Sequence, residues 1–275
     1  MSSRFRLYLG RQLLELRDRG NTMNTFPTAP IGWESSSFTS AGITHATYRK
    51  GAGPGVVVVH EIPGITPSVL AFAERVVAAG FTVVMPLLVG EVGREPSGKY
   101  MAKSMSKICI SREFTTLAMR QKSPVINWLR ALAKQLHNEV GGIGVGAIGM
   151  CFSGGFALGM MVDDIMVAPV LSQPSMPFSM GAARGADLGL SLDDEIIIKQ
   201  RAEAGCQVLG LRFTGDKLVG TRFASLQKLL GDAFIAVEFE SSSKSDHSVL
   251  TEQVRQSGVL RVLEFLQQKL KPNHS

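Results

Sequence analysis

The stretch that decides the fold is Ile143-Gly-Val-Gly-Ala-Ile-Gly-Met-Cys-Phe-Ser-Gly-Gly-Phe-Ala-Leu-Gly-Met-Met-Val162. Its first part is apolar and rich in β-branched residues, as expected of a buried strand, and the residues after Gly155 suit a helix. Between the two lies Gly149-Met-Cys-Phe-Ser-Gly154. A strand that turns sharply into a helix, with small residues on both sides of a central nucleophile, is known as a nucleophile elbow. Here the central side chain is the thiol of Cys151.

Two other interpretations of this stretch compete with the elbow. Residues 140–162 carry no charged side chain and are long enough to span a bilayer, although glycines interrupt them and acidic rather than basic residues flank them. Cys151 could also be an inert cysteine in a glycine-rich core segment, because most free cysteines are buried and unreactive. The rest of the chain has to distinguish between these interpretations.

The composition is that of a soluble globular protein with a sizeable core, since 45% of the 275 residues are hydrophobic. The net charge is +6, and half of this surplus lies in residues 1–20, so the remainder is nearly balanced and we expect no nucleic-acid partner. The three cysteines are far apart and form no CxxC pair. This spacing predicts a cytoplasmic protein without a zinc site, and the start of the chain lacks the apolar segment of a secretory signal.

The order of elements predicts an α/β fold with a mostly parallel central sheet and helices on both faces, because strands alternate with helices from residue 56 onward. We expect an N-terminal extension over residues 1–22, disordered or a short helix, and a single domain over residues 23–275. We expect irregular chain at 86–109 and 169–193. The expected strands are 43–49, 56–60, 81–85, 143–148, 165–168, 207–213 and 234–239, and the expected helices are 67–79, 112–137, 196–204, 222–230 and 251–270.

Two polar residues follow later strands and suit the chemistry of a cysteine nucleophile. A nucleophile needs a base, and the base needs an acid that orients it. In folds of this topology the chain order is nucleophile, acid, histidine. Asp216 follows the strand expected at 207–213, and His247 follows the strand expected at 234–239. Because the carboxyl ends of parallel strands meet at one edge of a sheet, we expect both to lie near Cys151.

Each of these residues also has a simpler interpretation. Asp216 alone could be an ordinary turn aspartate. His247 could be a surface-loop histidine, and Asp246 beside it is a rival acid. Ser153 is an alternative nucleophile, although it lies one turn into the helix. The ordered combination of elbow, aspartate and histidine is more specific than any one of its members.

Four ordered motifs resemble the dienelactone hydrolase family, from about residue 42 to the C-terminus. They are Val56-Val-Val-Val-His-Glu-Ile-Pro-Gly64, the Cys151 elbow, Gly215-Asp216 and Asp246-His-Ser248. The resemblance implies an α/β-hydrolase fold with a Cys-His-Asp catalytic triad. Cys151 would be the nucleophile, His247 the base and Asp216 the residue that orients the base.

The resemblance assigns further roles around the triad. In this family the glutamate that matches Glu61 contacts the resting thiol and takes part in its activation. The backbone N–H groups of Ile62 and Phe152 would form the oxyanion hole, which stabilises the developing charge. The implied activity is hydrolysis of a small ester or lactone through an acyl-enzyme. It needs no metal or organic cofactor.

The chain also departs from the family pattern. The family holds a substrate carboxylate with arginines, one of them four residues after the catalytic histidine, and this position is Thr251 here. The other arginine could be Arg94. We therefore expect a small ester or lactone other than a dienelactone, selected partly by apolar contacts from Phe178, Met176 or Phe152.

Two other classes of function remain open. The chain could be a catalytically silent member of the fold that binds a small molecule, or a redox or amidotransferase-like protein with an elbow cysteine. A small-molecule ester or lactone is the expected partner, with no nucleic acid and no membrane. The expected assembly is a monomer or a homodimer.

Overall fold

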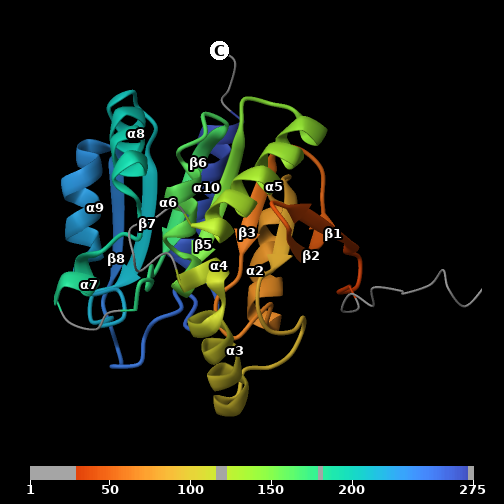
Figure 1. Ribbon diagram of the computed structural model, residues 1–275, viewed down its shortest axis with the longest axis horizontal. Helices are drawn as coiled ribbons and strands as arrows, with labels where there is room; N and C mark the ends of the chain where they lie inside the picture. The colour runs from red at the N-terminus through yellow and green to blue at the C-terminus, as the bar shows by residue number, and fades with distance from the viewer. Residues whose placement is uncertain (1–28, 116–122, 179–181, 272–275) are drawn as a thin grey trace, which may run out of the picture.

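The computed structural model describes residues 29–115, 123–178 and 182–271. In this part of the chain, eight strands form one sheet in the order β1-β2-β4-β3-β5-β6-β7-β8 (Figure 1). The strands are β1 (Glu34–Ser40), β2 (Ile43–Lys50), β3 (Gly55–Val59), β4 (Thr82–Leu87), β5 (Val145–Met150), β6 (Met166–Ser172), β7 (Val208–Phe213) and β8 (Phe234–Phe239). All neighbours from β4 to β8 are parallel, which confirms the predicted mostly parallel sheet.

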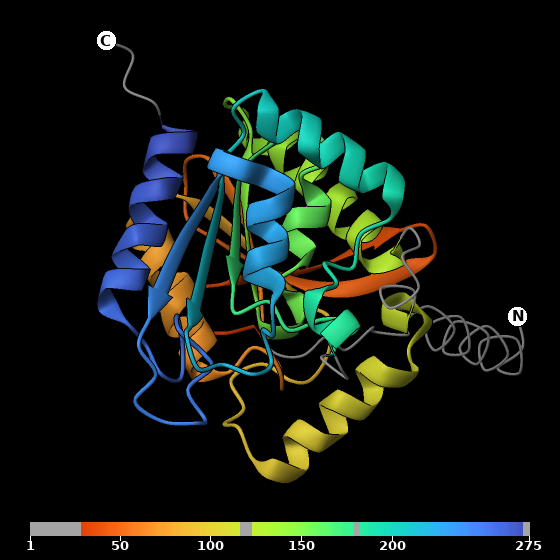
Figure 2. The ribbon, with the colours of Figure 1, turned by 90° about the vertical axis from the view of Figure 1, so that its left-hand side faces the viewer.

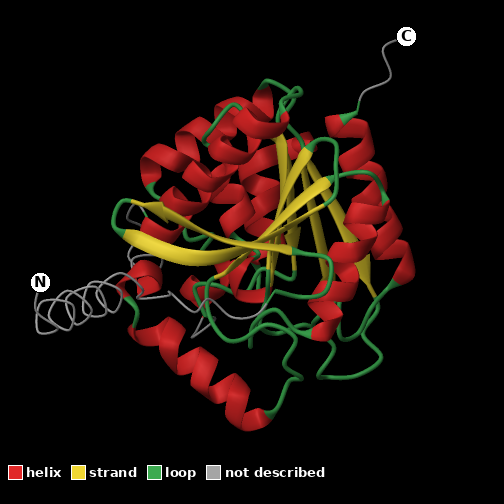
Figure 3. Cartoon of the chain, turned by 90° about the vertical axis from the view of Figure 1, so that its right-hand side faces the viewer, coloured by secondary structure: helices red, strands yellow, loops and turns green. Residues whose placement is uncertain are grey.

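The antiparallel part of the sheet lies at one edge. β1 pairs with β2, and β2 pairs with β4, both in antiparallel register. Figure 3 shows that the β1–β2 pair is strongly twisted relative to the parallel strands. The functional residues expected from the sequence all follow parallel strands, so this edge does not contribute to their position.

Helices cover both faces of the sheet (Figure 2). One face carries α2 and α10, and the other carries α5, α6, α8 and α9. The bounds of the described helices are α2 (Pro67–Ala78), α3 (Gly98–Ile110), α4 (Arg112–Thr115), α5 (Pro124–Val140), α6 (Phe156–Met160), α7 (Ala182–Ala186), α8 (Leu192–Glu203), α9 (Arg222–Leu230) and α10 (Gln256–Leu270), with 3-10 turns at Cys151–Ser153 and Gly231–Ala233.

The four valines of β3 show why the strand lies in the middle of the sheet. Val57 and Val59 join the core cluster on the face of α5 and α6, whereas Val56 and Val58 join the cluster on the face of α2 and α10. Successive side chains of a strand point to opposite faces. A continuous apolar run is therefore needed where both faces are buried.

The prediction of irregular chain over residues 86–109 is wrong for its second half, which forms α3. Ser97 caps this helix, since its hydroxyl accepts a hydrogen bond from the backbone N–H of Tyr100 at 3.4 Å. Tyr100, Ser104 and Ile108 are buried at four-residue spacing. The helix is amphipathic, but Gly90, Gly93 and Pro96 precede it closely, and these residues favour an irregular chain over the whole stretch.

Other helix boundaries differ by a few residues from expectation. α8 begins at Leu192 instead of residue 196, because the hydroxyl of Ser191 caps it. α10 begins at Gln256 instead of residue 251, which leaves Thr251 in the preceding loop. The predicted extension over residues 1–22 lies outside the described residues.

The alternative interpretation of residues 140–162 as a membrane span is wrong. This stretch is divided among the end of α5, the strand β5, a 3-10 turn and the short helix α6. Within the described ranges, no helix combines the length and the apolar character that crossing a bilayer requires.

Candidate active site

The elbow is built from a strained cysteine between two obligatory glycines. Cys151 directly follows β5 and has a φ of 54°, in the left-handed region that non-glycine residues rarely adopt. A Cβ at Gly149 would lie 2.1 Å from the carbonyl oxygen of Ser153, and one at Gly154 would lie 2.6 Å from the Cα of Pro174. Glycine is therefore required at both positions for the chain to turn this tightly.

His247 and Asp216 meet at the same edge of the sheet as the elbow. The Nδ1 atom of His247 lies 2.6 Å from Oδ2 of Asp216, and the other carboxylate oxygen of Asp216 accepts a hydrogen bond from the backbone N–H of Leu218 at 2.9 Å. The loop that carries the histidine is fixed by Gln253. Its side-chain oxygen accepts hydrogen bonds from the N–H groups of His247 and Ser248, at 3.3 and 2.8 Å. Both the ring and its acid are thus held in place.

The pKa of His247 is displaced by its surroundings. Burial lowers it, but the hydrogen bond to Asp216 and the nearby Cys151 outweigh burial and raise this pKa to about 10. The second ring nitrogen, Nε2, is buried and has no hydrogen-bond partner within the described part of the chain. His247 and Cys151 line the same cavity, so Nε2 is available to a group that reacts there.

The rival residues named from the sequence have other partners. The carboxylate of Asp246 accepts hydrogen bonds from the hydroxyl and the backbone N–H of Ser242, at 2.9 and 2.7 Å. These hydrogen bonds lower the pKa of Asp246. The hydroxyl of Ser153 is buried, accepts a hydrogen bond from the N–H of Met150 at 2.9 Å, and lies 3.0 Å from the carbonyl oxygen of His60. Ser153 therefore joins the ends of β5 and β3 and does not face the cavity.

Glu61 is buried among hydrogen-bond donors that belong to other loops. Its Oε2 accepts hydrogen bonds from the hydroxyl of Ser248 at 2.7 Å and from the amide of Gln173 at 3.2 Å. Its Oε1 accepts a hydrogen bond from the hydroxyl of Thr251. Among the described residues, both oxygens accept hydrogen bonds in this way, and no hydrogen bond joins either of them to the sulfur of Cys151. Glu61 and Cys151 line the same cavity.

Thr251 explains how Glu61 is held without a cation. The resemblance implies an arginine at this position, whereas here a hydroxyl donates to the carboxylate. Burial raises the pKa of Glu61, and the hydroxyls of Thr251 and Ser248, with a smaller effect of nearby His247, oppose only part of that shift. A buried carboxylate without a paired Lys or Arg is costly to ionise, so the donors around it influence its charge.

Gln173 is a site residue that the sequence analysis missed. It follows β6 with a positive φ of 35°, and its side chain is fully buried. Its amide oxygen accepts hydrogen bonds from the hydroxyl of Ser172 and from the N–H of Val249, at 3.4 Å for the latter. Gln173 thereby links the ends of two strands to Glu61. The available signal was a polar Ser-Gln pair directly after an apolar strand.

The two residues expected to form the oxyanion hole adjoin the nucleophile. Ile62 lines the cavity that contains Cys151, and Phe152 is the next residue after the nucleophile. The ring of Phe152 packs in the core against His60, with the ring centres 5.7 Å apart, and does not line the cavity. Burial lowers the pKa of His60 to about 4, and its Nδ1 lies 2.7 Å from the carbonyl oxygen of Glu61, which fixes the start of the Ile62 loop.

The triad borders a cavity of about 450 Å³ with largely apolar walls. The described residues that line it are Glu61, Ile62, Pro63, Pro96, Met101, Met105, Cys151, Ser175, Phe178, Leu218, Ser245, His247, Ser248, Glu252 and Gln253. Phe178 is therefore present as expected. Arg94 does not line the cavity, because its guanidinium binds Glu91 at 2.7 Å and lies over the ring of Tyr100.

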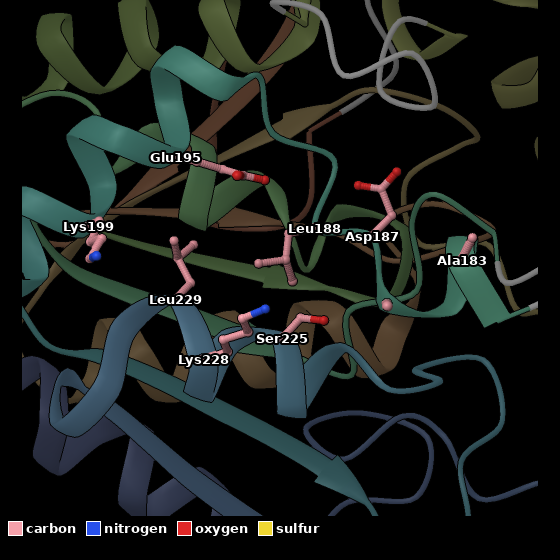
Figure 4. A pocket seen from close by; sticks show the side chains of 9 residues that line it. Ala183, Asp187, Leu188, Glu195, Lys199, Ser225, Lys228 and Leu229 are labelled. Carbon is pink, nitrogen blue, oxygen red and sulfur yellow. The ribbon is translucent and has the colours of Figure 1, made fainter.

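A second cavity, of about 360 Å³, lies between α7, α8 and α9 (Figure 4). Acidic and basic side chains both line it, with Glu195 and Lys199 on α8 and Lys228 on α9. It contains no cysteine or histidine. Across the described residues, no group of three or more His, Cys, Asp or Glu side chains is arranged to hold a metal ion.

Known proteins resemble this chain in sequence pattern and in fold. Residues 43–258 match the model of the dienelactone hydrolase family. A dienelactone hydrolase from Anabaena variabilis is 13% identical, with 87% of this chain and 98% of that chain covered and a TM-score of 0.59. A cold-adapted esterase from an Arctic intertidal metagenomic library is 16% identical, with 91% of this chain and 100% of that chain covered and a TM-score of 0.58. These likenesses confirm the α/β-hydrolase fold. No curated protein has a matching sequence.

Proposed function

Because the chain belongs to the dienelactone hydrolase family, whose members are hydrolases that act on ester bonds, we propose that it cleaves a small ester or lactone with Cys151 as the nucleophile. The observation that carries the proposal is the position of His247. One ring nitrogen is 2.6 Å from the carboxylate of Asp216, while the other has no partner among the described residues, and the ring shares the wall of the apolar cavity with Cys151, which also contributes to the raised pKa of His247. This is the arrangement that activates a cysteine for acyl transfer.

The first half of the reaction forms an acyl-enzyme. The thiolate of Cys151 attacks the carbonyl carbon of the substrate, and the electrons of the C=O double bond move to its oxygen. The backbone N–H groups of Ile62 and Phe152 stabilise this oxyanion. When the tetrahedral intermediate collapses, the alcohol oxygen leaves with a proton from Nε2 of His247.

The second half releases the acid. Neutral His247 takes a proton from a water molecule, which attacks the thioester carbonyl while Asp216 stabilises the imidazolium that forms. Collapse of the second tetrahedral intermediate expels the thiolate of Cys151 and gives the carboxylic acid. With a lactone, acid and alcohol remain in one molecule. Cys151, Cys109 and Cys206 are all free thiols, so a reducing cytoplasm suits the proposed nucleophile.

Glu61 contributes to this mechanism by positioning. It borders the cavity, and its donors Ser248 and Gln173 belong to the loops after β8 and β6. Because Ser248 is the neighbour of His247, a change in Glu61 would reach the base through this loop. We therefore assign Glu61 a role in holding His247 rather than a direct part in bond cleavage.

The test is hydrolysis of a panel of short p-nitrophenyl esters and simple lactones by the wild type and matched variants. We expect Cys151→Ala and His247→Ala to lower kcat/KM at least about 10³-fold, because each removes a group that takes part in bond making. Cys109→Ala is the control, since this thiol is exposed and outside the site. Circular dichroism checks that all variants are folded.

Two outcomes would contradict the proposal. If the wild type bound but hydrolysed none of these substrates, the chain would be a ligand-binding member of its family. If Cys151→Ala retained the wild-type rate, another group would be the nucleophile. Peroxide-sensitive activity that does not respond to loss of Asp216 would favour a redox role for the elbow cysteine.

A further inference from the structure

We propose that the catalytic cavity selects uncharged esters and lactones and rejects substrates that carry a carboxylate. The inference rests on the proposed ester hydrolysis at Cys151 and adds to it the charge class of the substrate. It follows from the side chains around the cavity, from the charge of the triad and from the partners of the nearby cations.

The cavity has acidic side chains but no basic partner for them. Among the described residues that line it, the charged or titratable side chains besides Cys151 are those of Glu61, Glu252 and His247, with no Lys or Arg. Glu252 is exposed at the cavity wall, and the hydroxyl of Thr66 lies 3.5 Å from its Oε1. A substrate carboxylate would therefore meet carboxylates and no fixed positive charge that could bind it.

The triad adds no net positive charge that would offset these carboxylates, whichever of its two resting protonation states is present. With a thiol and a neutral imidazole, the charge of Asp216 leaves the triad at minus one. With a thiolate and an imidazolium, the opposite charges of Cys151 and His247 cancel and leave the same total. Glu252 adds a second negative charge, and Glu61 adds a third when it is ionised. Like charges in a partly dry cavity repel more strongly than in water.

Nearby arginines are engaged elsewhere. Arg94 is paired with Glu91 at 2.7 Å and lies over an aromatic ring outside the cavity lining. The guanidinium of Arg255 lies over the ring of Phe213 and 4.0 Å from Asp246. Neither guanidinium faces the substrate space. Both would have to leave existing partners to bind an anion.

Among the described residues, a buried arginine and exposed lysines also lie close in the chain to residues of the lining. Arg222 donates only to backbone carbonyls, among them that of Leu218 at 3.0 Å. Lys217 and Lys244 adjoin lining residues in the chain, but both are exposed and neither lines the cavity. Water and salt screen such surface charges, so they compensate weakly for the acids inside.

The remaining wall suits an apolar acyl chain or lactone ring. Met101 and Met105 come from the same side of α3, while Phe178 and Leu218 come from loops after β6 and β7. Met101 and Leu218 remain 45% and 49% exposed, so the apolar wall reaches the outer surface. A carboxylate at the end of an acyl chain would lose its hydrating water molecules next to this apolar wall and would gain no hydrogen-bond donor to replace them.

The test compares two substrates that differ in the charge of one end and by a single methyl group. One is the mono-p-nitrophenyl ester of adipic acid, and the other is the same compound with its free carboxylate converted to the methyl ester. Release of p-nitrophenolate, corrected for spontaneous hydrolysis, reports cleavage of the same bond in both. We expect kcat/KM to be at least about tenfold higher for the methyl ester, mainly through KM, and the ratio to fall in 1 M NaCl.

A matched pair of variants locates the effect. Glu252→Gln removes a charge from the cavity, so the preference for the methyl ester should shrink about threefold. Glu203→Gln removes an exposed charge on α8, outside the cavity, and should leave the ratio at its wild-type value. Equal kcat/KM for the two substrates, or a preference for the carboxylate, would overturn charge selection while leaving ester hydrolysis in place. If neither substrate were cleaved, the proposed hydrolysis itself would fail.

Discussion

Two cavities of similar size, about 450 and 360 Å³, lie in this molecule, and their walls differ in chemistry. The catalytic cavity has apolar walls and acidic side chains without basic partners. The cavity between α7, α8 and α9 carries Lys199 and Lys228 together with Asp187 and Glu195 (Figure 4). The second has charges of both signs, as an ordinary solvated surface does, whereas the first concentrates negative charge.

Perturbed and strained residues also gather at the first cavity. The pKa values of His247 and Glu61 are both raised there. Cys151 and Gln173 hold positive φ angles at adjoining strand ends. Strain and displaced pKa values cost stability and persist mainly where function needs them. The two cavities have similar volumes, so volume does not identify the catalytic one. The raised pKa values and the strained backbone of the residues around it do.

The largest expected difference between the cavities concerns the acid of the triad. Asp216→Asn should lower kcat about 10²-fold with little change in KM, because the amide no longer stabilises the imidazolium that forms during turnover. Glu195→Gln alters a carboxylate of the second cavity and should change kcat less than about twofold. Steady-state hydrolysis of a p-nitrophenyl ester measures both. A larger loss in Glu195→Gln than in Asp216→Asn would reverse the assignment of the two cavities.

Arg222 should matter for both cavities. Its buried guanidinium donates hydrogen bonds to backbone carbonyls on two sides. One group lies near Phe178 and the second cavity, and the other lies in the loop after Asp216. These carbonyls belong to Pro177, Arg184, Asp187, Leu218 and Val219. Arg222→Met keeps the apolar stem but leaves the carbonyls without their donor, so we expect a loss of about 3 kcal/mol in the free energy of unfolding.

Urea denaturation measures this loss, and Arg222→Lys, which keeps a charge and some donors, should lie between the wild type and Arg222→Met. The KM of the folded Arg222→Met protein should also rise, since Phe178 and Leu218 line the catalytic cavity. A change in unfolding free energy below about 0.5 kcal/mol would show that the carbonyls find other partners.

The raised pKa of His247, at the catalytic cavity, predicts that the free energy of unfolding depends on pH. Since folding raises this pKa from 6.5 to about 10, the ion-pair stabilisation is complete below pH 6.5 and is lost as the pH rises through 10. The wild type should therefore lose about 2 kcal/mol or more relative to His247→Gln over this interval. Unfolding curves that run parallel for both proteins would contradict the prediction.

The smallest expected effect comes from Thr251. Thr251→Val removes a hydroxyl that donates to Glu61 and so raises the pKa of Glu61 further. The cost should appear only where the carboxylate is ionised in the folded protein, so it grows as the pH rises through the raised pKa of Glu61 and reaches about 1 kcal/mol. Thr251→Ser keeps the donor and should lose less. A pH-independent difference between Thr251→Val and the wild type would show that packing, and not the hydrogen bond, accounts for the loss.

The sequence predicts the alternating architecture well, because strong local signals determine it. The run Val56-Val-Val-Val59 identifies a strand buried on both faces, and the glycines around Cys151 identify the elbow through the clashes that any Cβ would cause. Asp216 and His247 are found from their order alone, since strand ends in a parallel sheet meet at one edge. Their 2.6 Å contact agrees with that expectation.

The rest depends on tertiary contacts that leave little trace in sequence. α3 is amphipathic, but the Gly and Pro residues just before it make the stretch resemble a loop. Gln173 acts through contacts with Glu61 and Val249, which are distant in the chain, so the polar Ser-Gln pair after the strand does not by itself indicate a role in the site. Arg94 could be proposed from its type, but only the structure reveals that Glu91 and Tyr100 hold it outside the cavity.

The most direct test of the central claim is to trap the acyl group. The protein is mixed with a slowly hydrolysed p-nitrophenyl ester, quenched in acid within milliseconds, digested and analysed by mass spectrometry. We predict that the mass of one acyl group appears on the peptide that contains Cys151, decays at the rate of turnover, and is absent in Cys151→Ala. An acyl group on another residue, or turnover without any acylated peptide in the wild type, would contradict Cys151 as the nucleophile.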